Sequence, residues 1–426
     1  MESKAGRDWR SILLAIACTG GAIMAVAMGA IVIVVQAAMS IRGDQQNPPF
    51  IDGILLASAI LFVGALLIPA AYCSLQQLIG EEVAADTTKP MNIRAGFLIA
   101  FIWLGTSALT QIFYGNAFLR WITPPLYILS IGLPVYFFAR LAIGGLNAGS
   151  KQRKWGALGT GILLGPSLAS FIELVLVVLL LFGIAAYLAF HPELSSVLDT
   201  IKAQINNTST PDDILTLLSP YLLNPIVIAL ALLFFSVIAP LVEETAKSLT
   251  VWLVFDHLSS PAQGFVIGAL SGTGFGLVES LLASVQPDSS WATTLIVRGG
   301  STMMHIVAAS LTGWGIAWFR ITKRPGRMIG MYALAMFLHS LWNACVILIV
   351  TGSIRSALGA HMENIMGMAF IIFGVSILAI IALSVPIALG MINWRLRTSS
   401  SPTRPAVTLP LPLPEGEEGE RKGWER

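Results

Sequence analysis

Charged residues are scarce in this sequence. They make up 11% of its 426 positions, whereas apolar residues make up 55% and the mean hydropathy is +0.78. Soluble domains carry about 25% charged residues, so this composition excludes a soluble globular protein. The net charge of +2 is too small to indicate a nucleic-acid partner. We therefore predict an integral, multi-pass membrane protein, which in a prokaryote would lie in the cell membrane with the lipid bilayer as its partner.

Cysteine is almost absent, and no phosphate-binding loop is present. The three cysteines lie inside apolar stretches without paired spacing, which argues against a disulfide framework or a thiolate metal site. The glycine-rich run 272–276 lacks the Lys-Ser/Thr ending of a nucleotide-binding loop. Gly268, Gly272 and Gly276 are instead spaced by four, which predicts close packing between two helices.

The alternating pattern of a membrane β-barrel is also lacking, because the apolar runs are continuous. A bilayer core takes roughly 20 apolar residues of helix, and the chain offers about ten such stretches. The fold class predicted is all-α, a polytopic transmembrane helix bundle. The expected spans are 11–36, 53–76, 95–114, 122–143, 157–189, 223–255, 262–285, 293–319, 328–352 and 364–392.

Lysine and arginine in the connections predict the orientation, since positive residues near span ends stay in the cytoplasm. With both termini inside, fifteen of these residues fall in inner segments and four in outer ones. The inner ones are Lys4, Arg7, Arg10, Lys89, Arg94, Lys151, Arg153, Lys154, Arg320, Lys323, Arg324, Arg327, Arg395, Arg397 and Arg404. The outer ones are Arg42, Arg120, Lys202 and Arg355.

Composition divides the chain into five parts. Residues 1–190 hold spans one to five, 191–222 form an outer amphipathic connection, and 223–352 hold a block of spans rich in polar residues. The last span falls in 353–397. The tail 398–426 is rich in proline and charge and is predicted to be disordered.

Ionisable side chains in mid-membrane are the most informative feature. An ionised group there costs at least about 2.5–3.5 kcal/mol, so it faces the protein interior and usually has a task. The polar block places several on four successive spans. They are Glu243, Glu244 and Lys247 on the sixth span, Glu279 on the seventh, Arg298 and His305 on the eighth, and His339 with Asn343 on the ninth.

Helical rise places three of these residues at one level. At about 1.5 Å per residue, Glu243, His305 and His339 each lie roughly 17–18 Å from one end of their spans. Glu279 lies nearer the outer side, about 9 Å from its span end. His339 and Asn343 are four residues apart and share one helix face, so both can address one substrate or water. A buried reaction site is therefore predicted between these helices.

Each of these residues also has a purely structural interpretation. A lone mid-span histidine is more often an interhelical hydrogen-bonding residue than a catalyst, and Arg298 can extend toward the outer interface. Glu243 or Glu244 can form a simple neutral pair with Lys247. In the functional alternative, one carboxylate pairs with Lys247 and the other points into the site as a general base.

The ordered set Glu-Glu-x-x-Lys, Phe-x-x-x-Glu, an isolated histidine and His-x-x-x-Asn resembles the PrsW family of intramembrane proteases. It covers about 243–343. That family is similar to the type II CAAX prenyl endopeptidases, from whose pattern this sequence departs at Lys247 and Glu279. Glutamate at position 279, where those relatives have histidine, leaves the catalytic class open between metal-dependent and glutamate-based.

The resemblance implies a role for each site residue. Glu243 would activate water, Glu244 would be held by Lys247, and Asn343 would stabilise the oxyanion. His305 and His339 would bind a metal or polarise the peptide carbonyl. With Glu279 as a further metal ligand, such a set suits a divalent metal, zinc in the first place. The substrates implied are membrane-embedded or membrane-associated proteins, such as transmembrane anti-sigma factors.

Two other functions remain compatible with these residues. An inactive membrane scaffold of the same fold would keep them as structural pairs. A proton-coupled transporter could use the buried Glu, Lys and His as a relay. Transporters commonly carry two related halves, whereas these ionisable residues form one block without a counterpart in spans one to five, which favours the intramembrane endopeptidase.

Overall fold

A computed structural model describes residues 9–41, 50–81, 85–116, 118–207, 211–287, 290–358 and 361–400. The all-α class predicted from the sequence is confirmed. Most of the predicted disordered tail, from residue 401 onward, lies outside the described residues. Its first three residues, 398–400, are the end of the last helix.

The elements follow one another in a simple order. The first half of the chain contains α1 (Trp9–Ile41), α2 (Phe50–Leu78), β1 (Ala85–Thr87), α3 (Ile93–Tyr114), η1 (Leu119–Ile122), α4 (Thr123–Ile143), β2 (Asn147–Ser150), α5 (Lys151–Ala189), α6 (Pro192–Asn206) and α7 (Pro211–Leu222). The second half contains α8 (Pro225–Leu233), η2 (Phe234–Ile238), α9 (Ala239–Leu253), η3 (Phe255–His257), α10 (Pro261–Ala283), α11 (Trp291–Thr322), α12 (Pro325–Leu358) and α13 (His361–Ser400).

Local sequence signals set several helix starts. The Ser150 and Ser260 side chains accept hydrogen bonds from backbone N–H groups in the first turns of α5 and α10, and Asn92 and Asn224 do the same for α3 and α8. Such caps satisfy N–H groups that have no partner inside the helix. Proline follows the cap in α8 and α10, where its missing N–H has no cost.

Nine helical segments among the described residues are long and apolar enough to cross a membrane. The expected span 293–319 is present as α11 but is not among them. α11 nevertheless runs beside α10 over its whole length: Gly264 packs on Gly313, Gly272 on His305, and the Ser280 hydroxyl bonds Thr302. α10 is itself long and apolar enough to span, and a crossing of the antiparallel α11 beside it stays a prediction. Nearly every residue of α11 from Ser301 to Ala317 is buried, which places this part of the helix inside the bundle.

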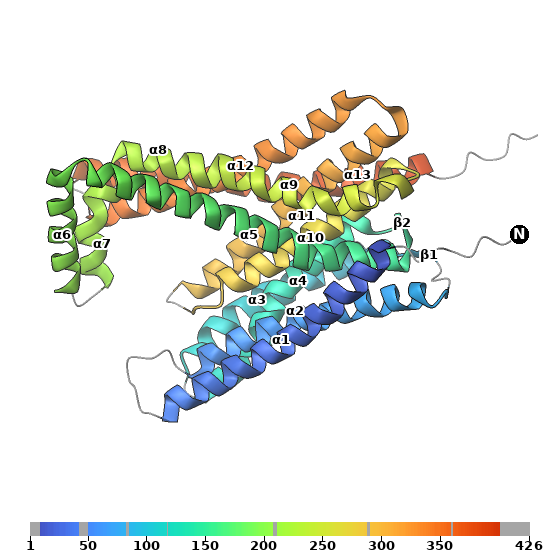
Figure 1. The fold of residues 1–426 in the computed structure, drawn as a ribbon, viewed down its shortest axis with the longest axis horizontal. Helices are drawn as coiled ribbons and strands as arrows, with labels where there is room; N and C mark the ends of the chain where they lie inside the picture. The colour runs from blue at the N-terminus through green and yellow to red at the C-terminus, as the bar shows by residue number, and fades with distance from the viewer. Residues whose placement is uncertain are drawn as a thin grey trace, which may run out of the picture.

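The glycine spacing on α10 produces this close contact, as predicted. A Cβ atom at Gly268 would overlap the Ala309 carbonyl, and one at Gly272 would overlap the His305 carbonyl. Only a residue without a side chain allows the two backbones to approach so far. α10 and α11 therefore form the centre of the molecule, between α5 and α9 on one side and α4 on the other (Figure 1).

The connections predicted to be cytoplasmic all lie at one end of the bundle. β1 pairs antiparallel with β2, which joins the α2–α3 connection to the α4–α5 connection. At the same end, Arg10 near the start of α1 contacts Asp256 and His257 in η3, and Arg320 near the end of α11 donates to the Asp256 carbonyl.

The end of the last helix lies there too. The Asn393 amide donates to the Ala142 and Gly144 carbonyls at 2.6 and 3.0 Å. The start of α1 and the end of α13 therefore lie at the same end of the bundle. This arrangement fits an even number of membrane crossings. The segment 191–222 forms α6 and α7 at the far end of α5 (Figure 1).

Candidate active site

The helix that carries Glu243 is irregular just before the site. Pro240 has no N–H, and the turn Phe234–Ile238 is π-helical, so the Phe235 carbonyl has no backbone donor at position 240. The Asn343 amide of α12 supplies one, donating to the Phe235 carbonyl at 2.8 Å. Asn343 thus ties α12 to η2. One of its two N–H groups is used in this way and is not available for the predicted oxyanion role.

Lys247 lies at the centre of a buried polar cluster. Its ammonium contacts Glu243 Oε2 at 3.1 Å, Glu244 Oε1 at 2.8 Å and His305 Nδ1 at 2.7 Å. It also lies 4.1 Å from the centroid of the Phe275 ring, which explains the phenylalanine of the Phe-x-x-x-Glu pattern. The sequence predicted one carboxylate partner for Lys247, whereas the structure gives it both.

The contacts of His305 define its tautomer. An ammonium has only donors, so Nδ1 must accept from Lys247 and the proton lies on Nε2. Nε2 is 2.5 Å from Glu279 Oε2, and Nδ1 is 3.6 Å from Glu243 Oε2. The ring is therefore held between two carboxylates, and its Nδ1 lone pair faces Lys247 and Glu243.

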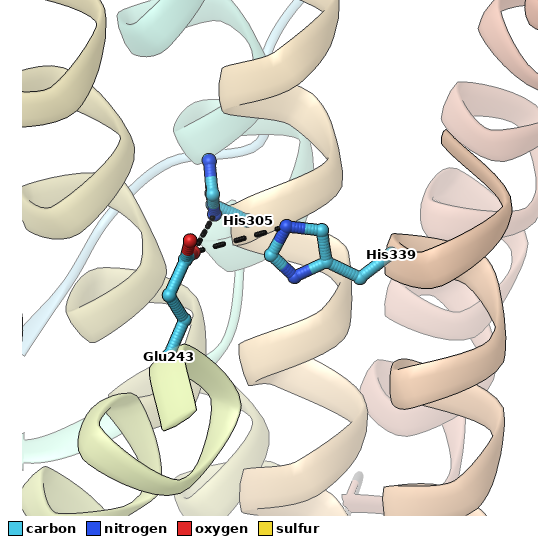
Figure 2. Close-up of side chains that lie close together, drawn as sticks. All are labelled: Glu243, His305 and His339. Carbon is cyan, nitrogen blue, oxygen red and sulfur yellow. Dashed lines mark ion pairs between the residues drawn. The ribbon is translucent and has the colours of Figure 1, made fainter. Parts of the chain in front are cut away.

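His339 is oriented in a similar way. Its Nδ1 lies 2.9 Å from Glu244 Oε1, and a carboxylate there fixes the proton on Nδ1. The other nitrogen, Nε2, faces Glu243 Oε2 at 3.8 Å. The two imidazole rings are 5.0 Å apart and nearly perpendicular (Figure 2). Each ring thus directs one unprotonated nitrogen toward Glu243.

Glu243, His305 and His339 form a group that could hold a metal ion, with one donor atom from each lying within 4.8 Å of the others. Figure 2 shows the three side chains converging from α9, α11 and α12. Two ligands of a tetrahedral zinc are roughly 3.3 Å apart, given bond lengths of about 2.0–2.2 Å. The contacts of 3.6 and 3.8 Å from Glu243 to the two imidazoles are close to this separation.

The contacts of Glu279 and Arg298 differ from those expected from their distances to the ends of their spans. Glu279 is not in that three-residue group; it contacts the opposite nitrogen of His305. Arg298 does not extend away from the site, because its guanidinium donates to Glu279 Oε1 at 2.7 Å. Glu279 therefore bridges Arg298 and His305.

Glu173 of α5 is the site residue that the sequence reasoning missed. Its carboxylate interacts electrostatically with Glu243, Glu279, Lys247 and His339, and its buried Oε1 has no hydrogen-bond partner among the described residues. The available signal was its position in the middle of the fifth span, where an ionisable residue is rare. A charge from outside the polar block therefore lies within electrostatic range of the site.

The part of the chain that contains these residues also matches a known family. Residues 205–381 match the PrsW family intramembrane metalloprotease model. The resemblance seen in the sequence is thereby confirmed over a region that includes every predicted site residue. No curated protein and no solved structure matches the chain. Together with its apolar helices, the PrsW region makes the chain an integral, multi-pass membrane protein.

Proposed function

We propose that this protein is an intramembrane endopeptidase that hydrolyses peptide bonds of membrane-embedded or membrane-associated proteins. The observation that carries the proposal is the convergence of a carboxylate and two oriented imidazoles deep in a helix bundle. His305 and His339 are 2% and 3% exposed, and each has a carboxylate on the side away from Glu243. The match of this region to the PrsW family supports the same class of reaction.

In this proposal Glu243 is the general base. Its side chain is 13% exposed, whereas Glu244 and Lys247 have no exposed side-chain surface, so Glu243 is the carboxylate of the pair that water can reach. It would take the proton from a water molecule that attacks the peptide carbonyl and deliver it to the leaving amine. Lys247 and Glu244 are positioning residues: the first holds both carboxylates, and the second orients His339.

Glu243, His305 and His339 together fit a divalent metal, zinc by ligand type and spacing, so Glu243 would serve either as the third ligand or as the base beside a metal held by the two imidazoles. His305 and His339 would hold it through the nitrogens that face Glu243, and Lys247 would have to withdraw from His305 Nδ1 to free that lone pair. When bound, such a metal would supply Lewis-acid polarisation of the peptide carbonyl. The carboxylates of Glu279 and Glu244 would act as outer-shell partners that fix the two rings.

The deciding test of the proposal is Glu243→Gln, assayed by cleavage of a reconstituted transmembrane substrate. The amide keeps the shape of the side chain but cannot accept the proton, so cleavage should fall about 10² to 10⁴-fold with insertion and folding intact. Glu81→Gln, the same change on an exposed carboxylate outside the site, should have no effect. Retained cleavage in both Glu243→Gln and Glu244→Gln would refute the assignment of the protein as a protease. If only Glu244→Gln lost cleavage, Glu244 would be the general base and Glu243 the positioning residue.

Metal dependence is tested separately, by measuring the metal content of the purified protein. Elemental analysis of the purified full chain should find a divalent metal, and His305→Ala and His339→Ala should each lose it. His191→Ala, at the end of α5 beside Tyr187, is the matched control and should keep the metal. A wild-type protein that cleaves its substrate without bound metal would instead establish the glutamate-based class.

A further inference from the structure

A cavity of about 400 Å³ lies between α1, α5 and α9, at the end of the bundle where the basic connections gather. This volume falls within the range of small-ligand sites. Its walls are mostly aliphatic side chains from all three helices. They include Leu13, Leu14, Leu163, Leu164, Leu253 and Val254.

The cavity also has a strongly basic part. Arg10 and Arg153 both line it, and both contact His257: the Arg10 guanidinium lies 3.1 Å from the His257 ring, and that of Arg153 donates to its carbonyl at 3.2 Å. The nearest carboxylate in this contact set is Asp256, 3.5 Å from Arg10 and with 75% of its side chain exposed. Two guanidinium groups thus lie at one end of the cavity, next to its aliphatic walls.

These two parts match an amphiphile with an anionic head and an apolar tail. Ser150, which caps the first turn of α5, also lines the cavity, so the positive end of that helix adds to the attraction for an anion. Basic pockets between transmembrane helices on the cytoplasmic side attract lipid phosphate groups. We propose that this cavity binds one anionic phospholipid, with its phosphate at Arg10 and Arg153 and an acyl chain along the leucines of α1 and α5.

The lipid would lie against the helix that carries the catalytic carboxylates. Thr160 of the cavity wall donates to Thr250 at 3.1 Å, and Ser271 bonds Thr250 at 3.0 Å and the Lys247 carbonyl at 2.9 Å. Thr250 is one helical turn beyond Lys247. A lipid in the cavity would therefore pack against the side of α9 that carries Thr250. Its binding would raise the thermal stability of the whole bundle. This binding does not depend on the proposed proteolysis.

The test is native mass spectrometry of the delipidated full chain with phosphatidylglycerol or phosphatidylcholine as the added lipid. Phosphatidylglycerol should bind at least about fivefold more tightly, and Arg10→Gln and Arg153→Gln should each weaken it by about fivefold, the effect of one cation near an anionic headgroup. Arg94→Gln, an exposed arginine at the start of α3, should leave binding unchanged. Equal binding of the two lipids, or equal loss with Arg94→Gln, would overturn the proposal.

The apolar part is tested separately from the charge. Ala17 lines the cavity and is exposed, so Ala17→Trp fills the space without removing a cation or a core residue. This variant should lose both the bound phosphatidylglycerol and the rise in melting temperature that the lipid causes. An unchanged rise in Ala17→Trp, or an equal rise with inorganic phosphate alone in the wild type, would show an anion site without a lipid and refute the proposal.

Discussion

Lys247 connects more of the site than any other described side chain. It bonds Glu243 and Glu244 on its own helix and His305 on α11, and its side chain has no exposed surface. Three partners around one ammonium offset the cost of removing the charge from water. The same contacts fix the tautomer of His305, so the orientation of that imidazole depends on the lysine.

Lys247→Ala should therefore lower stability as well as activity. It leaves the buried Glu244 and the partly exposed Glu243 without their cation, and breaking a buried ion pair from one side typically costs about 3–5 kcal/mol. Expression and melting temperature should both fall, in contrast to Glu243→Gln, which should lose activity alone. Lys151→Ala, at an exposed lysine, serves as the control in the same melting experiment. A stable, fully folded Lys247→Ala protein would contradict the role of Lys247 as the centre of this cluster.

The distance of each residue from the end of its span predicted which residues meet when their backbones lie at the same depth in the membrane. It predicted less well when a long side chain reaches a residue at another depth. Glu243, His305 and His339 were expected to meet, and their contacts of 3.6 and 3.8 Å agree. Glu279 lies nearer its span end, yet its carboxylate reaches His305 Nε2. The length of the glutamate side chain and the close packing of α10 on α11 bring the two groups together, and neither can be read from residue spacing.

At the scale of the helices, two backbone features place these side chains. A π-helical turn followed by Pro240 interrupts the regular hydrogen bonding where the chain enters α9, and Asn343 of α12 bonds the Phe235 carbonyl of that turn. On α10, Gly272 lets the backbone of α11 approach at His305 itself. The proline and the glycines therefore act on the site through geometry without touching the reacting groups.

Gly272→Ala should disturb the site without altering any of its chemical groups. The added methyl would overlap the His305 carbonyl, so α11 must move, and overpacking of this kind typically costs about 1–3 kcal/mol. Cleavage and metal content should drop together, and the melting temperature should fall. Gly330→Ala on α12, where a Cβ would meet no atom within 4 Å, is the matched control. Wild-type cleavage by Gly272→Ala would mean that the close contact does not position His305.

At the scale of the whole molecule, the structure agrees with the topology drawn from charge. The contacts of Arg10, Arg320 and Asn393 and the pairing of β1 with β2 bring the connections with abundant lysine and arginine to one end. Which side of the membrane this end faces remains a prediction of the positive-inside rule.

Reporter fusions test that orientation. A reporter placed after Arg324 should read as cytoplasmic, and one placed in the α6–α7 segment should read as external, because fifteen of the nineteen assigned lysines and arginines would then lie inside. The second fusion is the control, because three predicted spans lie between the two positions and place them on opposite sides of the membrane. An external signal after Arg324 would overturn the ten-span arrangement and require the stretch 223–255 to cross differently.

The sequence by itself determined that the chain lies in a membrane, where its helices run, and that four spans carry a buried polar site. These are local properties: the length of an apolar run and the cost of a charge in lipid act on each segment separately. Tertiary structure alone decided that Glu279 contacts His305 on the side away from Glu243. It also decided that Glu173 of α5 lies within electrostatic range of the site and that a cavity lined by two arginines lies beside α9. These features depend on how each helix is rotated and how closely it packs, and several segments must come together to produce them.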